Sequence, residues 1–229
     1  GSTHPENLQL KVVELGADVG FAYDGDADRL IATDEKGEPI DGDKIMCIVA
    51  RYLKQRGVLE TAVTVTVMSN LGLHKFMGEL DLTTDITKVG DRYVLERMLK
   101  TGSIMGGEQS GHMIFMKDGV TGDGILSSLK LVTAMCADGR KAGEVAADVV
   151  IYPQVLINVN VSDAVKNTYS SNDMVLEVVE EVNKKLKDKG RTLIRPSGTE
   201  PLVREMVEGE DTTEIEKYAE QIANVIKSI

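Results

Sequence analysis

Hydrophobic and polar positions change period several times between residues 39 and 151. The stretch 62–68 is rich in β-branched residues, which predicts a buried strand, whereas apolar residues recur at helical spacing in the stretch 43–55. Further helices are predicted at 69–80, 91–99, 123–135 and 142–149, with Asp123 as the cap of the third, and a short strand is predicted at 103–105. Strands that alternate with helices indicate a layered α/β domain with a mixed sheet over 39–151.

The pattern differs from residue 152 onward. The elements predicted there are a strand at 155–161, a long amphipathic helix at 172–189 that Gly190 would end, strands at 191–194 and 202–208, and a last helix capped by Asp211. This order of elements predicts a small α+β domain over 152–229.

The first 38 residues form a third region. A helix is predicted at 5–15, and strands at 19–23 and 30–33 flank an acidic loop. A piece of roughly 35 residues is too small to bury a core of its own. We therefore interpret residues 1–38 as the tail of something larger, which is either folded onto the next domain or separated from a missing one.

Composition excludes some classes of partner. The formal net charge is −11, so the overall field of the protein repels nucleic acid and acidic membrane surfaces. No apolar run reaches the ~20 residues that span a bilayer. Cys47 and Cys136 lie in apolar, helix-like stretches without metal-binding spacing. We expect both to be buried free thiols in a cytoplasmic protein.

Three carboxylates alternate in the loop after the strand 19–23, namely Asp24, Asp26 and Asp28. Carboxylate oxygens are the ligands that Mg²⁺ and Ca²⁺ prefer, and the small residues between them leave room for the backbone to curl around an ion. Acids packed between two buried strands repel one another unless a cation neutralises them, although a solvated acidic turn is the alternative. Arg29 would offset part of this charge or contact a phosphate beside the metal.

A calcium EF-hand is the other loop type with this spacing. If Asp24 takes position 1 of that motif, Glu35 takes position 12. Position 6 requires glycine for a sharp turn, but Arg29 stands there, and the flanking segments are strands rather than helices. The EF-hand is therefore rejected.

A second polar loop follows the predicted strand 103–105. Glu108 and Ser110 could bind vicinal hydroxyls of a sugar, and the glycines around them let a ligand approach the backbone closely. A polar turn without a ligand is the alternative. His112 is expected to be a structural histidine with satisfied hydrogen bonds.

A third loop, Arg195-Pro196-Ser197-Gly198-Thr199, joins two predicted strands. It combines a guanidinium group, two hydroxyls and backbone N–H groups near a glycine, which together can surround a phosphate. Arg204 on the following strand would add a second guanidinium group. A generic turn rarely concentrates these groups.

These loops in this order, with Thr87-Lys88-Val89-Gly90-Asp91-Arg92-Tyr93-Val94 and Thr121-Gly122-Asp123-Gly124, resemble the α-D-phosphohexomutase superfamily. Within it they are most similar to the bacterial phosphoglucosamine mutases, and the resemblance runs over the whole chain. Members have four domains around a central cleft, so the resemblance implies the end of domain 2 at 1–38, domain 3 at 39–151 and domain 4 at 152–229. It also implies a C-terminal fragment that lacks the phosphoserine domain.

The resemblance implies a role for each loop. The implied site residues are Asp24, Asp26 and Asp28 for Mg²⁺, Glu108 and Ser110 for sugar hydroxyls, and Arg195, Ser197, Gly198, Thr199 and Arg204 for the phosphate that does not react. Arg29 and Lys88 would support the site. No catalytic nucleophile is expected in this chain, because the phosphoserine belongs to domain 1.

The intact enzyme would interconvert glucosamine 6-phosphate and glucosamine 1-phosphate through its phosphoserine and a sugar 1,6-bisphosphate, for amino-sugar nucleotide and cell-wall precursor synthesis. The chain alone should be inactive and should hold Mg²⁺ weakly. Its expected partners are the sugar phosphate, the missing N-terminal domains and, as a further candidate, a second copy of itself. The same chemistry on mannose or glucose phosphate, or a non-catalytic module that binds a phosphosugar or a metal, are the alternatives.

Overall fold

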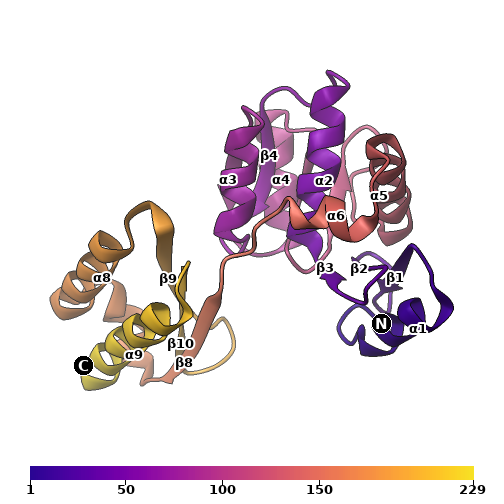
Figure 1. The fold of residues 1–229 in the computed structure, drawn as a ribbon. Helices are drawn as coiled ribbons and strands as arrows, with labels where there is room; N and C mark the ends of the chain where they lie inside the picture. Colours follow the sequence, from indigo (N-terminus) through magenta and orange to yellow (C-terminus); the bar gives the residue numbers. More distant parts are fainter. The chain divides into compact units, whose positions relative to one another are not determined.

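The chain divides between Val150 and Ile151 into two units (Figure 1), and the computed structural model describes residues 1 to 229. The first unit contains a small antiparallel sheet and a mixed sheet covered by helices, and the second contains an antiparallel sheet with helices. The predicted mixture of α/β and α+β architecture is confirmed. That residues 1–38 are the end of a further domain stays a prediction.

The main sheet of the first unit has the strand order β5-β4-β6-β7. Its strands are β4 (Ala62–Thr66), β5 (Thr83–Thr87), β6 (Met105–Gly107) and β7 (Met113–Phe115). β4 pairs in parallel with both β5 and β6, whereas β7 is antiparallel to β6. The carboxyl ends of β4, β5 and β6 therefore lie at one edge of the sheet, which is where open α/β sheets bind ligands.

Helices cover both faces of this sheet (Figure 1). These helices are α2 (Gly42–Gln55), α3 (Leu71–Glu79) and α4 (Asp91–Thr101), while α5 (Gly124–Asp138) and α6 (Ala142–Ala147) pack against α2. A Cβ added to Gly106 would meet Met98 of α4 at 2.8 Å, and one added to Gly107 would meet Met46 of α2 at 3.1 Å. Successive residues of a strand point to opposite faces, so α4 and α2 lie on opposite sides of β6.

Helix α2 is the centre of the first unit's core. The sequence predicts one apolar face, yet every residue from Ile45 to Ala50 is at most 1% exposed. The helix contacts β6, α3, α5 and α6, so neighbours cover most of its circumference. A helix surrounded in this way is buried beyond its most apolar stripe.

The first residues form α1 (Glu6–Leu15) and an antiparallel sheet of β1 (Val19–Tyr23), β2 (Leu30–Asp34) and β3 (Pro39–Ile40). Tyr23 pairs with Leu30 at the end of the β1–β2 ladder. The acidic loop is therefore the connection of a hairpin, and both of its ends are held by strand pairing.

The second unit has the strand order β8-β10-β9, with β10 antiparallel to both neighbours. Its elements are β8 (Gln154–Asn160), α7 (Asp163–Thr168), a 3₁₀ turn (Tyr169–Ser171), α8 (Asp173–Leu186), a second 3₁₀ turn (Lys187–Lys189), β9 (Gly190–Pro196), β10 (Leu202–Gly209) and α9 (Thr212–Ser228). Helices α8 and α9 pack on the sheet around Val159, Val203 and Val207. This is the expected α+β domain with one additional short helix, α7.

Three local predictions are wrong. Helix α8 ends at Leu186, because Lys187 takes a φ of 52°, and Gly190 is the extended first residue of β9 rather than a helix stop. The strand expected at 103–105 is β6, Met105–Gly107. Cys47 is buried but Cys136 is exposed, because α5 turns its neighbour Met135 inward.

No helix of the structure combines the length and the apolar character required to cross a membrane.

Candidate functional site

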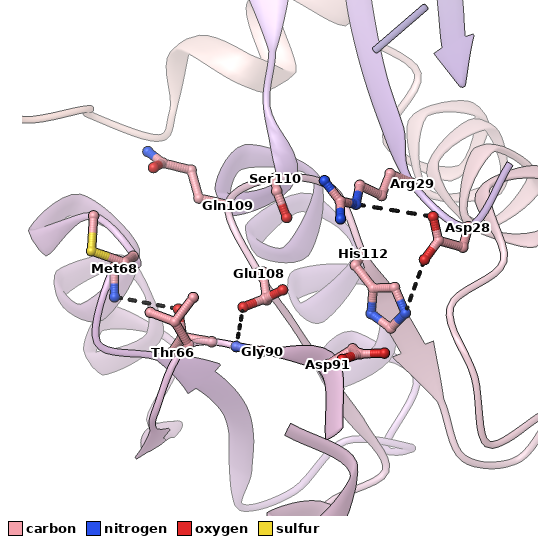
Figure 2. Close-up of a pocket in the computed structure, with 11 residues that line it drawn as sticks. Asp28, Arg29, Thr66, Met68, Gly90, Asp91, Glu108, Gln109, Ser110 and His112 are labelled. Atoms are coloured by element: carbon pink, nitrogen blue, oxygen red, sulfur yellow. Dashed lines mark hydrogen bonds and ion pairs between the residues drawn. The ribbon is translucent and has the colours of Figure 1, made fainter. Parts of the chain in front are cut away.

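A pocket of about 500 Å³ lies at the edge of the main sheet where the parallel strands end (Figure 2). Thr66 and Met68 come from the end of β4, Gly90 and Asp91 follow β5, and the 108–110 loop follows β6. Three separate connections therefore meet because the carboxyl ends of parallel strands are neighbours in space.

The loop after β6 is held by its own backbone and by α2. Gly111 N–H donates to Glu108 O at 2.9 Å, and Gly42 N–H donates to Gln109 O at 3.0 Å. Glu108 also reaches across the pocket, where its Oε1 accepts the N–H of Gly90 at 2.8 Å (Figure 2). The Glu108 carboxylate is thereby fixed, while Ser110 is exposed on the pocket wall.

The β1–β2 hairpin is joined directly to this loop. Leu30 N–H donates to Gly111 O at 3.0 Å, and Arg29 and His112 form an isolated β-bridge. Gly111 has a φ of 95°, and a Cβ there would meet Leu30 O at 2.1 Å. Only glycine permits this approach, so the predicted metal loop and the predicted sugar loop share one backbone junction.

The acidic loop gathers its three carboxylates. One oxygen from each of Asp24, Asp26 and Asp28 lies within 4.8 Å of the others. Ala27 between them has a φ of 60°, which is uncommon for alanine, and its carbonyl accepts the N–H of Gly124 at 2.9 Å. The motif at 121–124 therefore supports the acidic loop from behind, which its sequence alone did not reveal.

The electrostatics of these carboxylates differ. Partial burial, together with the neighbouring Asp24 and Asp26 charges, raises the pKa of Asp28. Burial acts in the same direction on Asp24, but the Arg29 N–H, which donates to Asp24 Oδ1 at 3.2 Å, contributes to a pKa below its usual value. The Arg29 Nε atom lies 3.5 Å from Asp24 and 3.9 Å from Asp28, so its charge offsets only part of the repulsion.

The acidic loop fits a hard divalent cation. Its donor set is made of oxygen atoms, which Mg²⁺ prefers. Asp28 Oδ1 is buried and accepts no hydrogen bond, so it has an unused lone pair beside the other carboxylates. Mg²⁺ held by Asp24, Asp26 and Asp28 would supply that missing interaction.

His112 differs from its sequence-based expectation. It is 3% exposed, and its Nε2 lies 3.6 Å from Asp28 Oδ2 (Figure 2). Its Nδ1 is buried without a hydrogen-bond partner, so the expectation of a fully satisfied structural histidine is wrong. A Cβ at Gly122 would meet the His112 ring at 2.3 Å, so the 121–124 motif also makes room for this side chain.

Not every predicted site residue of the first unit lies in the pocket. Arg29, Glu108 and Ser110 line it together with Asp28. Lys88 does not, because its Nζ lies 6.0 Å above the ring of Tyr93. Sequence reasoning missed Asp91 as a lining residue. The rule that loops after parallel strands gather at one edge could have found it.

The predicted phosphate loop belongs to the second unit and is the turn between β9 and β10. Gly198 and Thr199 are exposed at its tip, and a Cβ at Gly198 would meet no atom within 4 Å. Ser197 is only 3% exposed, because its hydroxyl turns inward and accepts the N–H of Glu200 at 3.2 Å. Four predicted residues of this loop are therefore adjacent, but the Ser197 hydroxyl faces into the turn.

Two arginines stand side by side at the base of this turn. Arg195 and Arg204 are direct partners in the β9–β10 ladder, so their side chains leave the same face. Arg204 donates to Glu200 Oε2 at 2.8 Å, while its Nε is buried without a partner. Like charges opposite one another destabilise a sheet, which favours an anion as the neutralising ligand.

Two family models match the chain. "Phosphoglucomutase/phosphomannomutase, alpha/beta/alpha domain III" matches residues 41–152, and "Phosphoglucomutase/phosphomannomutase, C-terminal domain" matches residues 156–225. The chain belongs to the phosphoglucomutase/phosphomannomutase family. The superfamily resemblance seen in the sequence motifs is thereby confirmed.

Curated members of this family include phosphoglucosamine mutases. That of Caldicellulosiruptor bescii is 52% identical over 229 residues, which is 100% of this chain and 51% of the relative. The phosphoglucosamine mutase of Oceanobacillus iheyensis is 52% identical over 228 residues, covering 99% of this chain and 51% of the relative. The chain thus spans about half the length of the curated relatives it matches.

Solved structures share this fold. The N-acetylphosphoglucosamine mutase of Aspergillus fumigatus, in complex with GlcNAc-6P and magnesium, matches with a TM-score of 0.76 and 21% identity over 91% of this chain and 48% of that one. A variant of that enzyme in complex with glucose 1,6-bisphosphate matches with a TM-score of 0.73 and 22% identity, covering 92% and 48%.

Proposed function

We propose that this chain carries the metal, sugar and phosphate sites of a phosphoglucosamine mutase. That enzyme would interconvert glucosamine 6-phosphate and glucosamine 1-phosphate. The observation that carries the proposal is the junction at Gly111, where the backbone of the acidic hairpin and that of the sugar loop are hydrogen-bonded beside one pocket. The identity of about half to relatives of this name supports the choice of substrate.

The proposed reaction needs a phosphoserine outside the domains matched here. This serine gives its phosphoryl group to the sugar monophosphate, and the resulting 1,6-bisphosphate reorients and returns its other phosphoryl group to the serine. Mg²⁺ bound to Asp24, Asp26 and Asp28 would neutralise charge on the transferring group. In-line phosphoryl transfer demands little from the protein beyond positioning and charge stabilisation.

The residues of this chain position the sugar. Glu108 is fixed by the N–H of Gly90 and would accept hydrogen bonds from ring hydroxyls. The Ser110 hydroxyl would accept hydrogen bonds from them or donate to them. Arg195 and Arg204, with the turn 197–199, would bind the phosphate that does not react. Both substrate orientations present a phosphate at that end, so one clamp serves both half-reactions.

The test is a chimera in which this chain replaces the matched half of the Caldicellulosiruptor bescii relative. We expect ³¹P NMR to show conversion of glucosamine 6-phosphate to glucosamine 1-phosphate with Mg²⁺ and a 1,6-bisphosphate activator. The Asp28→Asn variant of the chimera should lose this turnover. Turnover of mannose or glucose phosphate in preference to glucosamine phosphate would overturn the proposed substrate.

The chain by itself provides a second test. We expect binding of Mg²⁺ and sugar phosphate by calorimetry without detectable turnover, because the phosphoryl carrier is a serine of another domain. The Mg²⁺ affinity should be weak, since the three carboxylates leave most of the coordination sphere to water or substrate. Mutase activity of the chain alone would contradict the proposed division of roles.

A further inference from the structure

Helix α5 buries polar side chains and exposes apolar ones in its first two turns. Ser127 and Ser128 are buried, and their hydroxyls donate to Asp123 O and Ile125 O at 2.7 Å. On the opposite side, Ile125 is 58% exposed and Leu129 is 61% exposed. A helix between a core and water normally has the reverse arrangement, so these turns present a second apolar surface that the chain itself does not cover.

This surface continues along the helix as a stripe of exposed residues, Ile125, Leu129 and Cys136. Spacings of four and eleven residues return to nearly the same face of an α-helix. Lys130 is the only charged residue of α5 before its last one, and it pairs with Asp118 at 2.8 Å. The α5 stripe therefore contains no charge that would favour contact with water.

The α5 stripe begins directly beside the acidic loop. Gly124 N–H donates to Ala27 O at 2.9 Å, and Tyr23 Oη donates to Ser128 Oγ at 3.0 Å. Ile125 follows Gly124 in the chain, so the stripe starts one residue from the backbone contact with the loop. A domain that reaches the carboxylates of the acidic loop would lie next to this end of the stripe.

We propose that the α5 stripe is the docking surface for the domain that brings the phosphoserine to the acidic loop. This inference rests on the proposed function, in which the phosphoserine belongs to another domain. The chain makes up 51% of the Caldicellulosiruptor bescii relative, so a second half of similar length is available to supply that domain. Burial of the apolar stripe would hold the two halves together at the point where the serine must meet the metal loop.

A second copy of this chain fits the stripe less well. A symmetric contact through α5 would bring the two acidic loops toward each other, because each loop is joined to the start of its own α5. The chain also has a formal net charge of −11, and like charges disfavour association.

The test compares the reactivity of a single thiol in the chain alone and in the chimera with the Caldicellulosiruptor bescii relative. Leu129→Cys places this thiol on the stripe. Leu99→Cys on α4 is the matched control, because Leu99 is 62% exposed and Leu129 is 61% exposed. Alkylation by iodoacetamide, measured for each peptide by mass spectrometry, should be roughly tenfold slower at Leu129→Cys in the chimera than in the chain alone. Leu99→Cys should react at the same rate in both proteins.

Three results would contradict this docking surface. The first is an equal rate of alkylation at Leu129→Cys in the chain and in the chimera. The second is slower alkylation of Leu99→Cys in the chimera, which would show a change that is not confined to the stripe. The third is a rate at Leu129→Cys that falls as the concentration of the chain alone increases, which would assign the stripe to a second copy.

The labelling does not depend on turnover, so the two proposals can fail separately. Protection of Leu129→Cys in a chimera without mutase activity would support the docking surface and overturn the proposed reaction. Turnover by a chimera in which Leu129→Cys stays fully reactive would overturn the docking surface and leave the proposed function standing.

Discussion

The pocket of the first unit is assembled from connections spread between Asp28 and His112, whereas the phosphate loop of the second unit is one turn between neighbouring strands. The first is acidic and depends on close backbone contact between remote segments. The second is basic, and its residues bond mainly to one another, as Arg204 and Glu200 do. A site built from remote segments depends on tertiary packing, whereas a site on one turn depends on the stability of its own hairpin.

The hairpin of the second unit buries one acid without a hydrogen-bond partner, Glu205. This residue lies on β10 between Val203 and Val207, is 0% exposed, and neither carboxylate oxygen has a hydrogen-bond partner. Burial raises the pKa of Glu205 to about 8 from a usual value of 4.5. A neutral carboxyl is therefore favoured inside the sheet.

The largest change in folding stability is expected when Glu205 is replaced by an uncharged residue of similar volume, because its carboxyl titrates differently in the folded and unfolded states. Below pH 4.5 the carboxyl is protonated in both states, and between that pH and 8 only the unfolded state loses its proton. Folding stability therefore falls as pH rises, by about 1.4 kcal/mol per pH unit, until the folded state also ionises near pH 8. Glu205→Met should remove this penalty and stabilise the second unit by about 4 kcal/mol at pH 8.

Hydrogen exchange read by mass spectrometry reports each unit separately and is the measurement we propose. Protection of β10 should rise in Glu205→Met, and its decline between pH 5 and 8, after correction for intrinsic exchange, should flatten. The first unit is the internal control and should not change. If protection of β10 declined equally with pH in the wild-type chain and in Glu205→Met, Glu205 would be ionised in the folded protein.

The next largest loss of stability is expected at the backbone junction between Gly111 and Leu30 in the first unit. Gly111→Ala would place a Cβ against Leu30 O, and the φ of 95° strains any side chain there, so we expect a loss of about 3 kcal/mol. Exchange at the β1–β2 hairpin and the 108–112 loop should rise together. Gly102→Ala is the matched control, because its φ is 76° but no atom lies near the added Cβ, and it should cost about 1 kcal/mol.

If Gly111→Ala loosened only the 108–112 loop and left the hairpin protected, the two loops would not share one junction. The site of the first unit would then not depend on packing between these two remote segments.

A smaller change, in affinity for phosphate, is expected at the neighbouring arginines Arg195 and Arg204. Arg204→Met should remove half of the like-charge pair, so the unit keeps its stability without ligand but loses about tenfold in affinity for inorganic phosphate, or ~1.4 kcal/mol. The control is Arg191→Met on the same strands, because Arg191 pairs with the buried Glu208 at 2.6 Å. That variant should lose stability and keep phosphate binding.

The measurement is protection of β9 and β10 from exchange with and without phosphate. Protection by phosphate that survives in Arg204→Met would remove this arginine from the proposed phosphate site.

The sequence correctly predicted those helix boundaries that depend on neighbouring residues alone. The caps at Asp123 and Asp211 were identified in advance, because one side chain accepting one N–H defines each of them. Helix α7 was not identified, since none of its residues is buried and it has no apolar periodicity to detect. The end of α8 was misplaced because Lys187, which is not a glycine, leaves the helix.

The same distinction holds for the candidate site. The carboxylates Asp24, Asp26 and Asp28 could be recognised from spacing, because the ligands lie within one loop. The environment of His112 could not, because a buried unpaired Nδ1 is defined by neighbours that are remote in sequence.

The smallest losses of stability are expected at the two predicted helix caps. They allow a direct comparison, because Asp123 caps α5 of the first unit and Asp211 caps α9 of the second. Asp123 accepts the N–H of Leu126 at 2.9 Å, and Asp211 accepts that of Glu214 at 3.0 Å. Replacing either by Ala should cost about 1 kcal/mol. The helix after Asp123 begins at Gly124, whose N–H donates to Ala27 O in the acidic loop. Asp123→Ala should therefore also weaken Mg²⁺ binding in a calorimetric titration, whereas Asp211→Ala should leave it unchanged. Equal Mg²⁺ affinity in the two variants would show that the acidic loop does not depend on the start of α5 for its shape.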